Sequence, residues 1–349
     1  MSKKFKTLIT ADFDLSYLEP IKDKLEIETA GYIVNKEILE PSDLIEKIRD
    51  KDILISEYET VSKEIIESAP NLKFIGCCRG GVGTAVDIEV ATEKDIIVVS
   101  TPGRNANAVA DFIMGLLLDI TRNITKANNL IKNRIITSDI SSKPGHYKDT
   151  VWGMDDNSPF VKYSGVSLTG KKLGIIGFGK IGGLLAKKAD CFGLDILVYD
   201  PYIKSESIKD LDIEITGLDE LYKQSDFITL CCALTKDTKG MISQEAFSKM
   251  KNSAYIINTG RGALINEEDL YKALKSKIIA GAALDVLTVE PISPDNPLLD
   301  LESIILTPHL AGASDEVKKE TSQMMAERLK GFLIHKIPNN VVNPEVFYN

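Results

Sequence analysis

Three glycines spaced Gly177-x-Gly179-x-x-Gly182 constrain the fold of this 349-residue chain more than any other feature. The apolar stretch KLGII precedes them directly, and a helical pattern begins near Lys180. A strand, a tight glycine turn and a helix in this order are typical of the first βαβ unit of a doubly wound parallel sheet. The spacing by itself is also compatible with a glycine turn that binds nothing.

The sequence after this turn indicates that the turn binds a dinucleotide. Eighteen residues after Gly182, the next apolar stretch ends at Asp200, an acid that can accept hydrogen bonds from an adenosine ribose and repel a 2′-phosphate. We therefore expect a dinucleotide-binding domain that prefers NAD to NADP. Its expected strands are the six stretches KLGIIGF, DILVYD, DFITLCC, AYIINTG, AGAALDV and SIILTPH. The residues expected to hold NAD at the first two strands are Gly177, Phe178, Gly179, Lys180, Ile181, Gly182 and Asp200.

A second α/β pattern occupies the first hundred residues. Four strand-like stretches, KTLIT, DILIS, LKFIGCC and IIVVS, alternate with helical patterns. A long amphipathic pattern predicts one helix over 106–132, and another helix is expected over 314–335. The fold class is thus α/β, with two doubly wound parallel-sheet domains.

Charge and cysteine content exclude several kinds of partner. The formal net charge of −9, without a basic patch, argues against nucleic acid and anionic membranes as partners. The five cysteines are odd in number and have no CxxC spacing, which favours reduced thiols in the cytoplasm. No signal peptide and no apolar run of about 20 residues is present. With only three histidines, we expect no metal site.

The stretches NTGRGALI, AALDVLTVEP and LTPHLAGAS together resemble the D-2-hydroxyacid dehydrogenase family, the group that contains D-3-phosphoglycerate dehydrogenase. The resemblance spans nearly the whole chain. It implies hydride transfer between nicotinamide and C2 of a 2-hydroxy or 2-keto acid. By residue match, Arg261 would hold the substrate carboxylate and carbonyl oxygen, His309 would be the acid/base, and Glu290 would pair with His309.

The chemistry of the reaction independently requires these residue types. Reduction of a keto acid places negative charge on the carbonyl oxygen, which a planar arginine can stabilise while it also binds the carboxylate. The same oxygen must gain a proton, which a histidine held by a carboxylate can supply near neutral pH. Taken singly, Arg261, Glu290 and His309 could each be an ordinary surface residue.

The resemblance also implies further binding residues and a domain plan. A cofactor domain over 104–314 would be inserted into a flavodoxin-like substrate domain, 1–103 plus 315–349. The turn RGGVG, which could also be a plain glycine turn, would receive the substrate carboxylate, and Asn105 would contact substrate at the domain hinge. Further cofactor-binding residues would be Asn258, Thr259, Gly260, Asp285 and Gly312. The residues expected to bind substrate in the first domain are Arg79, Gly80, Gly81, Val82 and Asn105.

Some positions depart from the family pattern. Cys231 and Ala233 stand where the family often has histidine and proline, so cofactor contact there would be through the backbone. Asp111 stands where the family usually has glutamate. Because the chain ends at Asn349, we expect no feedback through a C-terminal regulatory domain.

The segment 133–165 has little periodicity and contains the sole tryptophan, Trp152. The resemblance implies that this segment reaches across a two-fold axis towards the other subunit's active site, which would make the protein a homodimer. Trp152 could instead pack on its own subunit.

Two other functions occur on the same fold. Relatives of this fold that act as NAD-responsive corepressors keep the same three residues, but an extended interaction tail is absent here. Oxidation of formate would call for glutamine beside the histidine rather than Glu290. We therefore expect an NAD-dependent enzyme acting on a D-2-hydroxy acid or its keto acid.

Overall fold

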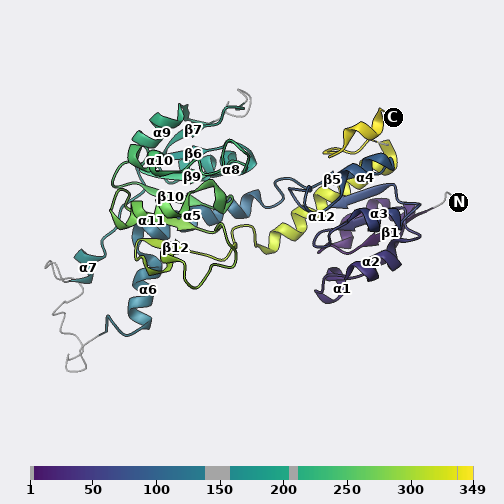
Figure 1. Ribbon diagram of the computed structural model, residues 1–349, viewed down its shortest axis with the longest axis horizontal. Helices are drawn as coiled ribbons and strands as arrows, with labels where there is room; N and C mark the ends of the chain where they lie inside the picture. Colours follow the sequence, from purple (N-terminus) through teal and green to yellow (C-terminus); the bar gives the residue numbers. More distant parts are fainter. Residues whose placement is uncertain (1–3, 138–157, 204–210, 336, 349) are drawn as a thin grey trace. The chain divides into compact units, whose positions relative to one another are not determined.

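The computed structural model describes residues 4–137, 158–203, 211–335 and 337–348 (Figure 1). The chain forms two compact units. Unit 1 consists of Met1–Asn105 and Ala313–Asn349, and unit 2 consists of Ala106–Gly312. Unit 2 is therefore inserted in the sequence of unit 1. The chain passes from unit 1 to unit 2 after residue 105 and back after residue 312, whereas the expected boundaries follow residues 103 and 314.

Unit 1 contains a five-stranded parallel sheet in the order β2-β1-β3-β4-β5. This 2-1-3-4-5 order is that of flavodoxin-like folds, as expected. The three strands β3, β4 and β5 are buried at every position, which explains why they read as continuous apolar runs. The strands are β1 (Phe5–Ile9), β2 (Leu25–Thr29), β3 (Ile53–Ser56), β4 (Phe74–Cys77) and β5 (Ile97–Ser100).

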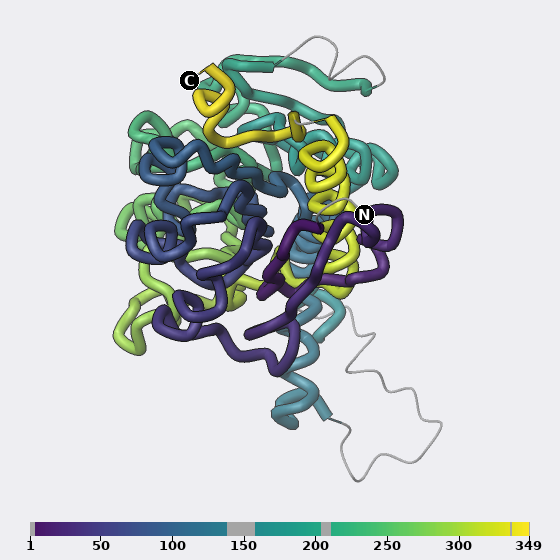
Figure 2. The backbone as a smooth tube through the Cα atoms, turned by 90° about the vertical axis from the view of Figure 1, so that its right-hand side faces the viewer, coloured from purple at the N-terminus to yellow at the C-terminus, as the bar shows by residue number. Residues whose placement is uncertain are grey.

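The helices of unit 1 cover both faces of this sheet and build two apolar cores. They are η1 (Leu15–Lys24), α1 (Tyr32–Asn35), α2 (Pro41–Ile48), α3 (Lys63–Glu67), α4 (Ile88–Glu93) and α12 (Asp315–Lys330), with the π-helix η5 (Gly331–His335) and the short 3₁₀ helix η6 (Pro344–Phe347). Met325 and Leu329 of α12 are fully buried in the core that contains Ile9 and Phe74. In Figure 2, α12 (yellow) lies beside the N-terminal segment (purple).

The C-terminal tail returns to the edge of the same sheet. The buried Asn343 side chain accepts a hydrogen bond from the Val98 N–H (2.9 Å) and donates to the Ile96 carbonyl (2.9 Å). The Val342 N–H adds a bond to the Val98 carbonyl (2.8 Å). These bonds attach the tail to β5.

Unit 2 contains a seven-stranded parallel sheet in the order β12-β11-β10-β9-β6-β7-β8. Strand order reverses at β6, as in dinucleotide-binding folds, so the predicted Rossmann-like domain is confirmed. The strands are β6 (Lys172–Ile176), β7 (Asp195–Tyr199), β8 (Ile213–Ile215), β9 (Phe227–Leu230), β10 (Tyr255–Asn258), β11 (Gly281–Leu284) and β12 (Ile304–Leu306). The helices are α5 (Ala106–Arg122), α6 (Ile124–Lys132), α7 (Pro159–Lys162), α8 (Lys180–Asp190), α9 (Leu218–Gln224), α10 (Gln244–Lys249) and α11 (Glu267–Lys275), with the short turns η3 (Gly262–Leu264) and η4 (Pro297–Asp300).

The structure differs from the secondary-structure expectations in two respects. The edge strands β2 and β8 were not predicted, because they are short or largely exposed and lack an apolar run. The single helix expected over 106–132 is broken at Asn123, whose φ of +54° is left-handed. Asparagine tolerates this conformation better than most residues. The last helical stretch spans the expected residues, since α12 ends at Lys330 and the π-helix η5 continues to His335.

Candidate functional site

The glycine turn joins β6 to α8, and each of its glycines has a distinct role. Gly177 has a φ of +95°, and a Cβ there would lie 2.6 Å from the Cys232 nitrogen. A Cβ on Gly182 would lie 2.4 Å from the Gly177 carbonyl oxygen. A Cβ on Gly179 would meet nothing within 4 Å. The turn therefore leaves open space at the N-terminus of α8, where a pyrophosphate can approach backbone N–H groups.

Asp200 follows β7 and reaches the glycine turn. Its Oδ2 accepts a hydrogen bond from the Phe178 N–H (2.6 Å), and its Oδ1 accepts one from the Tyr202 N–H (2.8 Å). The acid thus lies beside the second residue of the turn. Each carboxylate oxygen has a further lone pair with which it can accept a ribose hydroxyl.

His309 and Glu290 form a hydrogen-bonded pair in unit 2. His309 Nδ1 lies 2.7 Å from Glu290 Oε2, and the other Glu290 oxygen accepts the Leu287 N–H (2.8 Å). Partial burial acts to raise the pKa of Glu290, but these hydrogen bonds and the charges of His309 and Arg261 outweigh it, so the pKa is lowered. Glu290 is therefore a carboxylate at neutral pH that orients the imidazole.

Arg261 is the third residue after the end of β10. The Asn258 side chain fixes this corner, since it accepts the Gly260 N–H (3.0 Å) and donates to the Arg261 carbonyl (2.9 Å). A Cβ on Gly262 would lie 2.0 Å from the Leu287 carbonyl carbon, so only glycine fits after Arg261. The guanidinium is exposed and, among the described residues, forms no salt bridge. It is thus available to a carboxylate ligand.

Asp285 has a role that the sequence did not predict. It is 1% exposed, and its oxygens accept hydrogen bonds from the Leu310 N–H (2.8 Å), the Ala311 N–H (2.8 Å) and the Thr307 hydroxyl (2.6 Å). The Asp285 carbonyl also accepts the His309 N–H (2.8 Å). Asp285 therefore holds the loop that carries His309. An Asp-Val after a buried strand gives no sequence signal for this task.

The candidate residues share one edge of the unit 2 sheet. Arg261 follows β10, Asp285 and Glu290 follow β11, His309 follows β12, and the glycine turn follows β6. Since all these strands are parallel, their carboxyl ends lie on the same side. Open α/β sheets bind their ligands there, outside the carboxyl ends of the strands.

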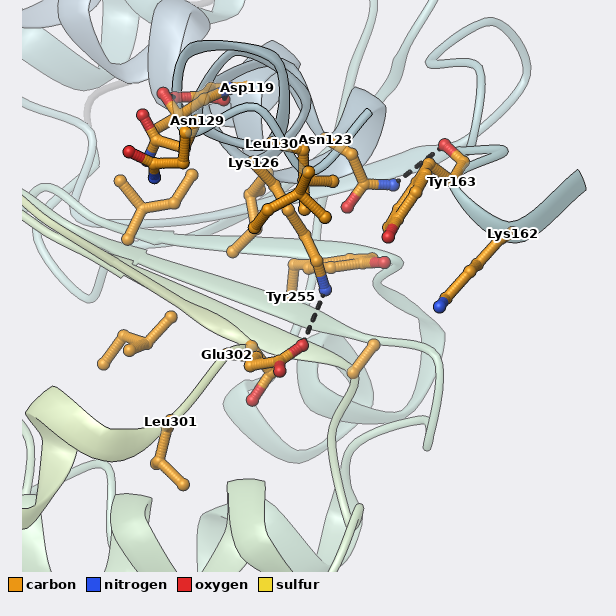
Figure 3. Close-up of a pocket in the computed structure, with 18 residues that line it drawn as sticks. Asp119, Asn123, Lys126, Asn129, Leu130, Lys162, Tyr163, Tyr255, Leu301 and Glu302 are labelled. Atoms are coloured by element: carbon orange, nitrogen blue, oxygen red, sulfur yellow. Dashed lines mark hydrogen bonds and ion pairs between the residues drawn. The ribbon is translucent and has the colours of Figure 1, made fainter. Parts of the chain in front are cut away.

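A cavity of about 720 Å³ lies at the opposite edge of this sheet, where the strands begin (Figure 3). Its lining includes Tyr255, the first residue of β10, and Ser303, just before β12. Lys126 of α6 reaches across it to Glu302 at 2.9 Å. The amino ends of the strands form this cavity, so it is separate from the candidate site.

In unit 1, the turn Arg79–Val82 follows β4. Thr101 donates its N–H to the Arg79 carbonyl (2.9 Å), which ties the turn to the end of β5. Gly80 and Gly81 are exposed, and a Cβ on Gly81 would meet nothing within 4 Å. A cavity of about 330 Å³ is lined by Gly80, Val82 and residues of the C-terminal tail. Asn105 is the last residue of unit 1 before the chain enters unit 2.

The cysteines form no disulfide bond. All five are free. Burial raises the pKa of Cys231 to about 12, so this thiol is protonated at neutral pH and is a poor nucleophile.

Two kinds of feature are absent from the described part of the chain. No group of three or more His, Cys, Asp or Glu side chains there is arranged to hold a metal ion. No helix there is both long and apolar enough to cross a membrane. Trp152, and with it the predicted intersubunit contact, lies outside the described residues.

Comparisons with known proteins agree on one family. Residues 114–311 match the family described as D-isomer specific 2-hydroxyacid dehydrogenase, NAD binding domain. A D-3-phosphoglycerate dehydrogenase of Methanocaldococcus jannaschii is 38% identical over 97% of this chain, which spans 59% of that relative's length. A glyoxylate reductase of Korarchaeum cryptofilum is 37% identical over 87% of the chain and 86% of its own length. A crystal structure of a Thermus thermophilus protein superposes with a TM-score of 0.76 at 28% identity, covering 97% of this chain and 99% of that one.

Proposed function

The chain belongs to the D-isomer specific 2-hydroxyacid dehydrogenase family, and from this premise we propose that Arg261, Glu290 and His309 are its catalytic residues. It is an NAD-dependent oxidoreductase that acts on a CH–OH group. The observation that carries the assignment is the 2.7 Å bond between His309 and Glu290 on the sheet edge where the glycine turn lies.

Each catalytic residue has one task in keto-acid reduction. NADH, when bound, supplies a hydride to C2 of the substrate. His309 donates a proton to the carbonyl oxygen, and Glu290 holds the imidazolium that does so. Arg261 binds the carboxylate and stabilises the negative charge that develops on the carbonyl oxygen. In the oxidation direction, His309 accepts the proton.

The cofactor is held by residues of unit 2. The open space at Gly179 receives the pyrophosphate, and Asp200 binds the ribose hydroxyls, which favours NAD over NADP. The turn's remaining residues, together with Thr259, Gly260, Asp285 and Gly312, line the cofactor's path. Because both Asp285 oxygens already accept hydrogen bonds, its main effect on the nicotinamide side is to fix the loop 307–311.

Substrate binding also uses unit 1. The turn Arg79–Val82 binds the substrate carboxylate through its amides, and Asn105 adds a polar contact. The exposure of Gly80 and Gly81 supports this role, because their N–H groups stand where a ligand can reach the backbone.

The reaction is tested with purified protein, NADH or NADPH, and a panel of 2-keto acids that includes glyoxylate and hydroxypyruvate. We expect NADH oxidation with at least one keto acid and much weaker use of NADPH. Binding of NADH without turnover of any keto acid would instead support an NAD-responsive binding protein, a function that the named relatives do not support.

The protein acts as a homodimer in the cytoplasm. Large apolar side chains are exposed in the sequence before and after residues 138–157. They are Ile124, Ile131 and Ile135 before these residues, and Phe160 after them. Such a concentration of exposed apolar groups favours association with a second copy. The five free thiols favour a reducing compartment.

A further inference from the structure

One loop of unit 2 carries Glu290 and connects β11 to the short turn η4. Residues 288–291 of this loop are exposed, and Val289 is 63% exposed. Side-chain packing therefore does little to fix the loop, since exposed positions have few apolar contacts. Its position depends instead on hydrogen bonds from other elements. Because Glu290 binds His309, those hydrogen bonds also affect the proposed acid/base residue.

Glu267, the first residue of α11, binds this loop at two points. Its Oε1 accepts a hydrogen bond from the Thr288 N–H (2.6 Å), and its Oε2 accepts a longer one from the Asn296 side chain (3.4 Å). Asn296 in turn accepts the Leu298 N–H (3.0 Å) at the start of η4. Hydrogen bonds to a carboxylate are stronger than those to a neutral acceptor. The side chain of Glu267 thus holds the loop on either side of Glu290.

The peptide group at the start of this loop also touches the chain beside Arg261. A Cβ on Gly262 would lie 2.0 Å from the Leu287 carbonyl carbon and 2.4 Å from the Thr288 nitrogen. The Leu287 N–H donates to Glu290 Oε1 (2.8 Å). The peptide between Leu287 and Thr288 therefore lies directly between the residue after Arg261 and the loop of Glu290. A shift of this peptide would change the distance between those two side chains.

Keto-acid reduction requires this distance to be held closely. Arg261 binds the substrate carboxylate while His309 must reach the adjacent carbonyl oxygen, and a misplacement of about 1 Å can cost about 10²-fold in rate. Asn258 fixes the corner of Arg261, and Asp285 fixes the backbone that carries His309. The loop of Glu290 is the third part of this arrangement, and the first residue of α11 fixes it.

We propose that Glu267 is a positioning residue that keeps Glu290 aligned with Arg261 for keto-acid reduction. Through Glu290 it also orients His309. Glu267 acts by the reach of its side chain rather than by its charge, because its main partner is the uncharged Thr288 N–H. This inference rests on the proposed function and adds to it a residue that touches neither substrate nor cofactor.

Two variants of Glu267 separate reach from charge. Glu267→Asp keeps the charge at the N-terminus of α11 but is one methylene group too short for the bond to Thr288. Glu267→Gln loses the charge, yet its amide oxygen can still accept that N–H. With the keto acid that the wild-type protein reduces fastest, we expect kcat to fall by about 10–10²-fold in Glu267→Asp and to stay within a few-fold of wild type in Glu267→Gln. The matched controls are Glu268→Asp and Glu268→Gln at the next residue, which pairs with Lys272, and neither should change kcat.

Three further measurements distinguish positioning from a general structural role. In Glu267→Asp the alkaline limb of log kcat/KM against pH should move to lower pH, because a misplaced Glu290 stabilises the imidazolium less. The KM for the keto acid should change less than kcat, since Asn258 still fixes Arg261. The thermal midpoint and NADH affinity should stay close to wild type.

The outcomes separate this inference from the proposed function. Wild-type kcat and pH profile in Glu267→Asp would overturn the inference, and so would an equal fall of kcat in Glu267→Asp and Glu267→Gln, which would assign the effect to charge. No turnover of any keto acid by the wild-type protein would instead contradict the proposed function.

Discussion

His309 occupies a backbone conformation that most residues avoid. Its φ is +58°, in the left-handed region, which is costly for a residue with a Cβ. The hydrogen bonds from residues 307–311 to Asp285 hold the backbone there. Because Asp285 is buried at the end of β11, it fixes the backbone that carries His309, which suits the role that we propose for this residue.

Replacement of His309 tests its role as proton carrier. We expect His309→Ala to lower kcat for keto-acid reduction by roughly 10²–10⁴-fold, the usual loss for a general acid/base. NADH affinity should stay close to wild type, since His309 is assigned to the substrate's oxygen. Steady-state kinetics and NADH fluorescence titration measure the two quantities, with the exposed His335→Ala as control. A kcat within a few-fold of wild type would exclude His309 as the proton carrier.

Glu290 links activity to pH. Its pKa is lowered, so Glu290 is negatively charged at neutral pH and stabilises the protonated form of His309. This stabilisation is lost only when the pH falls through the lowered pKa of Glu290. In Glu290→Gln the imidazolium loses its anionic partner and gives up its proton at a lower pH. We therefore expect the alkaline limb of the keto-acid reduction profile to move to lower pH. An alkaline limb at the wild-type position, measured as log kcat/KM against pH, would remove Glu290 from this role.

At the scale of elements, the strand–turn–helix signature was sufficient to predict the cofactor fold. Gly177 and Gly179 between β6 and α8, and Gly182 in the first turn of α8, have the close approaches and open space that their spacing predicts. Strands buried on both faces were also predictable, because burial requires a continuous apolar run. The edge strands β2 and β8 and the break at Asn123 were not, since neither needs such a run.

The glycine turn allows a contrast between two similar substitutions. In Gly182→Ala the new methyl group would lie 2.4 Å from the Gly177 carbonyl oxygen, so we expect a lower thermal midpoint and loss of NADH binding together. In Gly179→Ala the methyl group enters open space, so stability should be kept while NADH affinity falls. Gly183→Ala, also without a neighbour within 4 Å, is the control. Calorimetry and NADH titration separate the effects, and wild-type NADH affinity in Gly179→Ala would contradict the pyrophosphate assignment.

The candidate site was predictable at the same scale only in part. Motif matches identified Arg261, Glu290 and His309, and the pair His309–Glu290 is in hydrogen-bonding contact. The supporting role of Asp285 was not predictable. Asp285 acts through bonds to a loop 22–26 residues later in the sequence. Such contacts depend on strand order, which a motif does not encode.

At the scale of the whole molecule, the exposed apolar surface around α6 bears on assembly. Ile131 and Ile135 are 61% and 67% exposed. If a second copy covers them, a charge at Ile131 opposes association without disturbing a core. We expect Ile131→Asp to shift the protein from dimer towards monomer in sedimentation velocity, and Ile38→Asp, at an exposed isoleucine of unit 1, to leave the dimer intact. A dimer of unchanged affinity in Ile131→Asp would place the interface elsewhere.

The reaction that we propose determines the chirality of the product at C2 and the origin of the hydrogen bound there. The measurement uses the full chain with NADH deuterated at C4 on either face and a keto acid such as hydroxypyruvate. We expect one D-2-hydroxy acid to form for each NADH that is oxidised to NAD. Deuterium should appear at C2 with only one of the two labelled cofactors. Formation of the L-acid, or a product without deuterium at C2 from both cofactors, would contradict the proposed reaction.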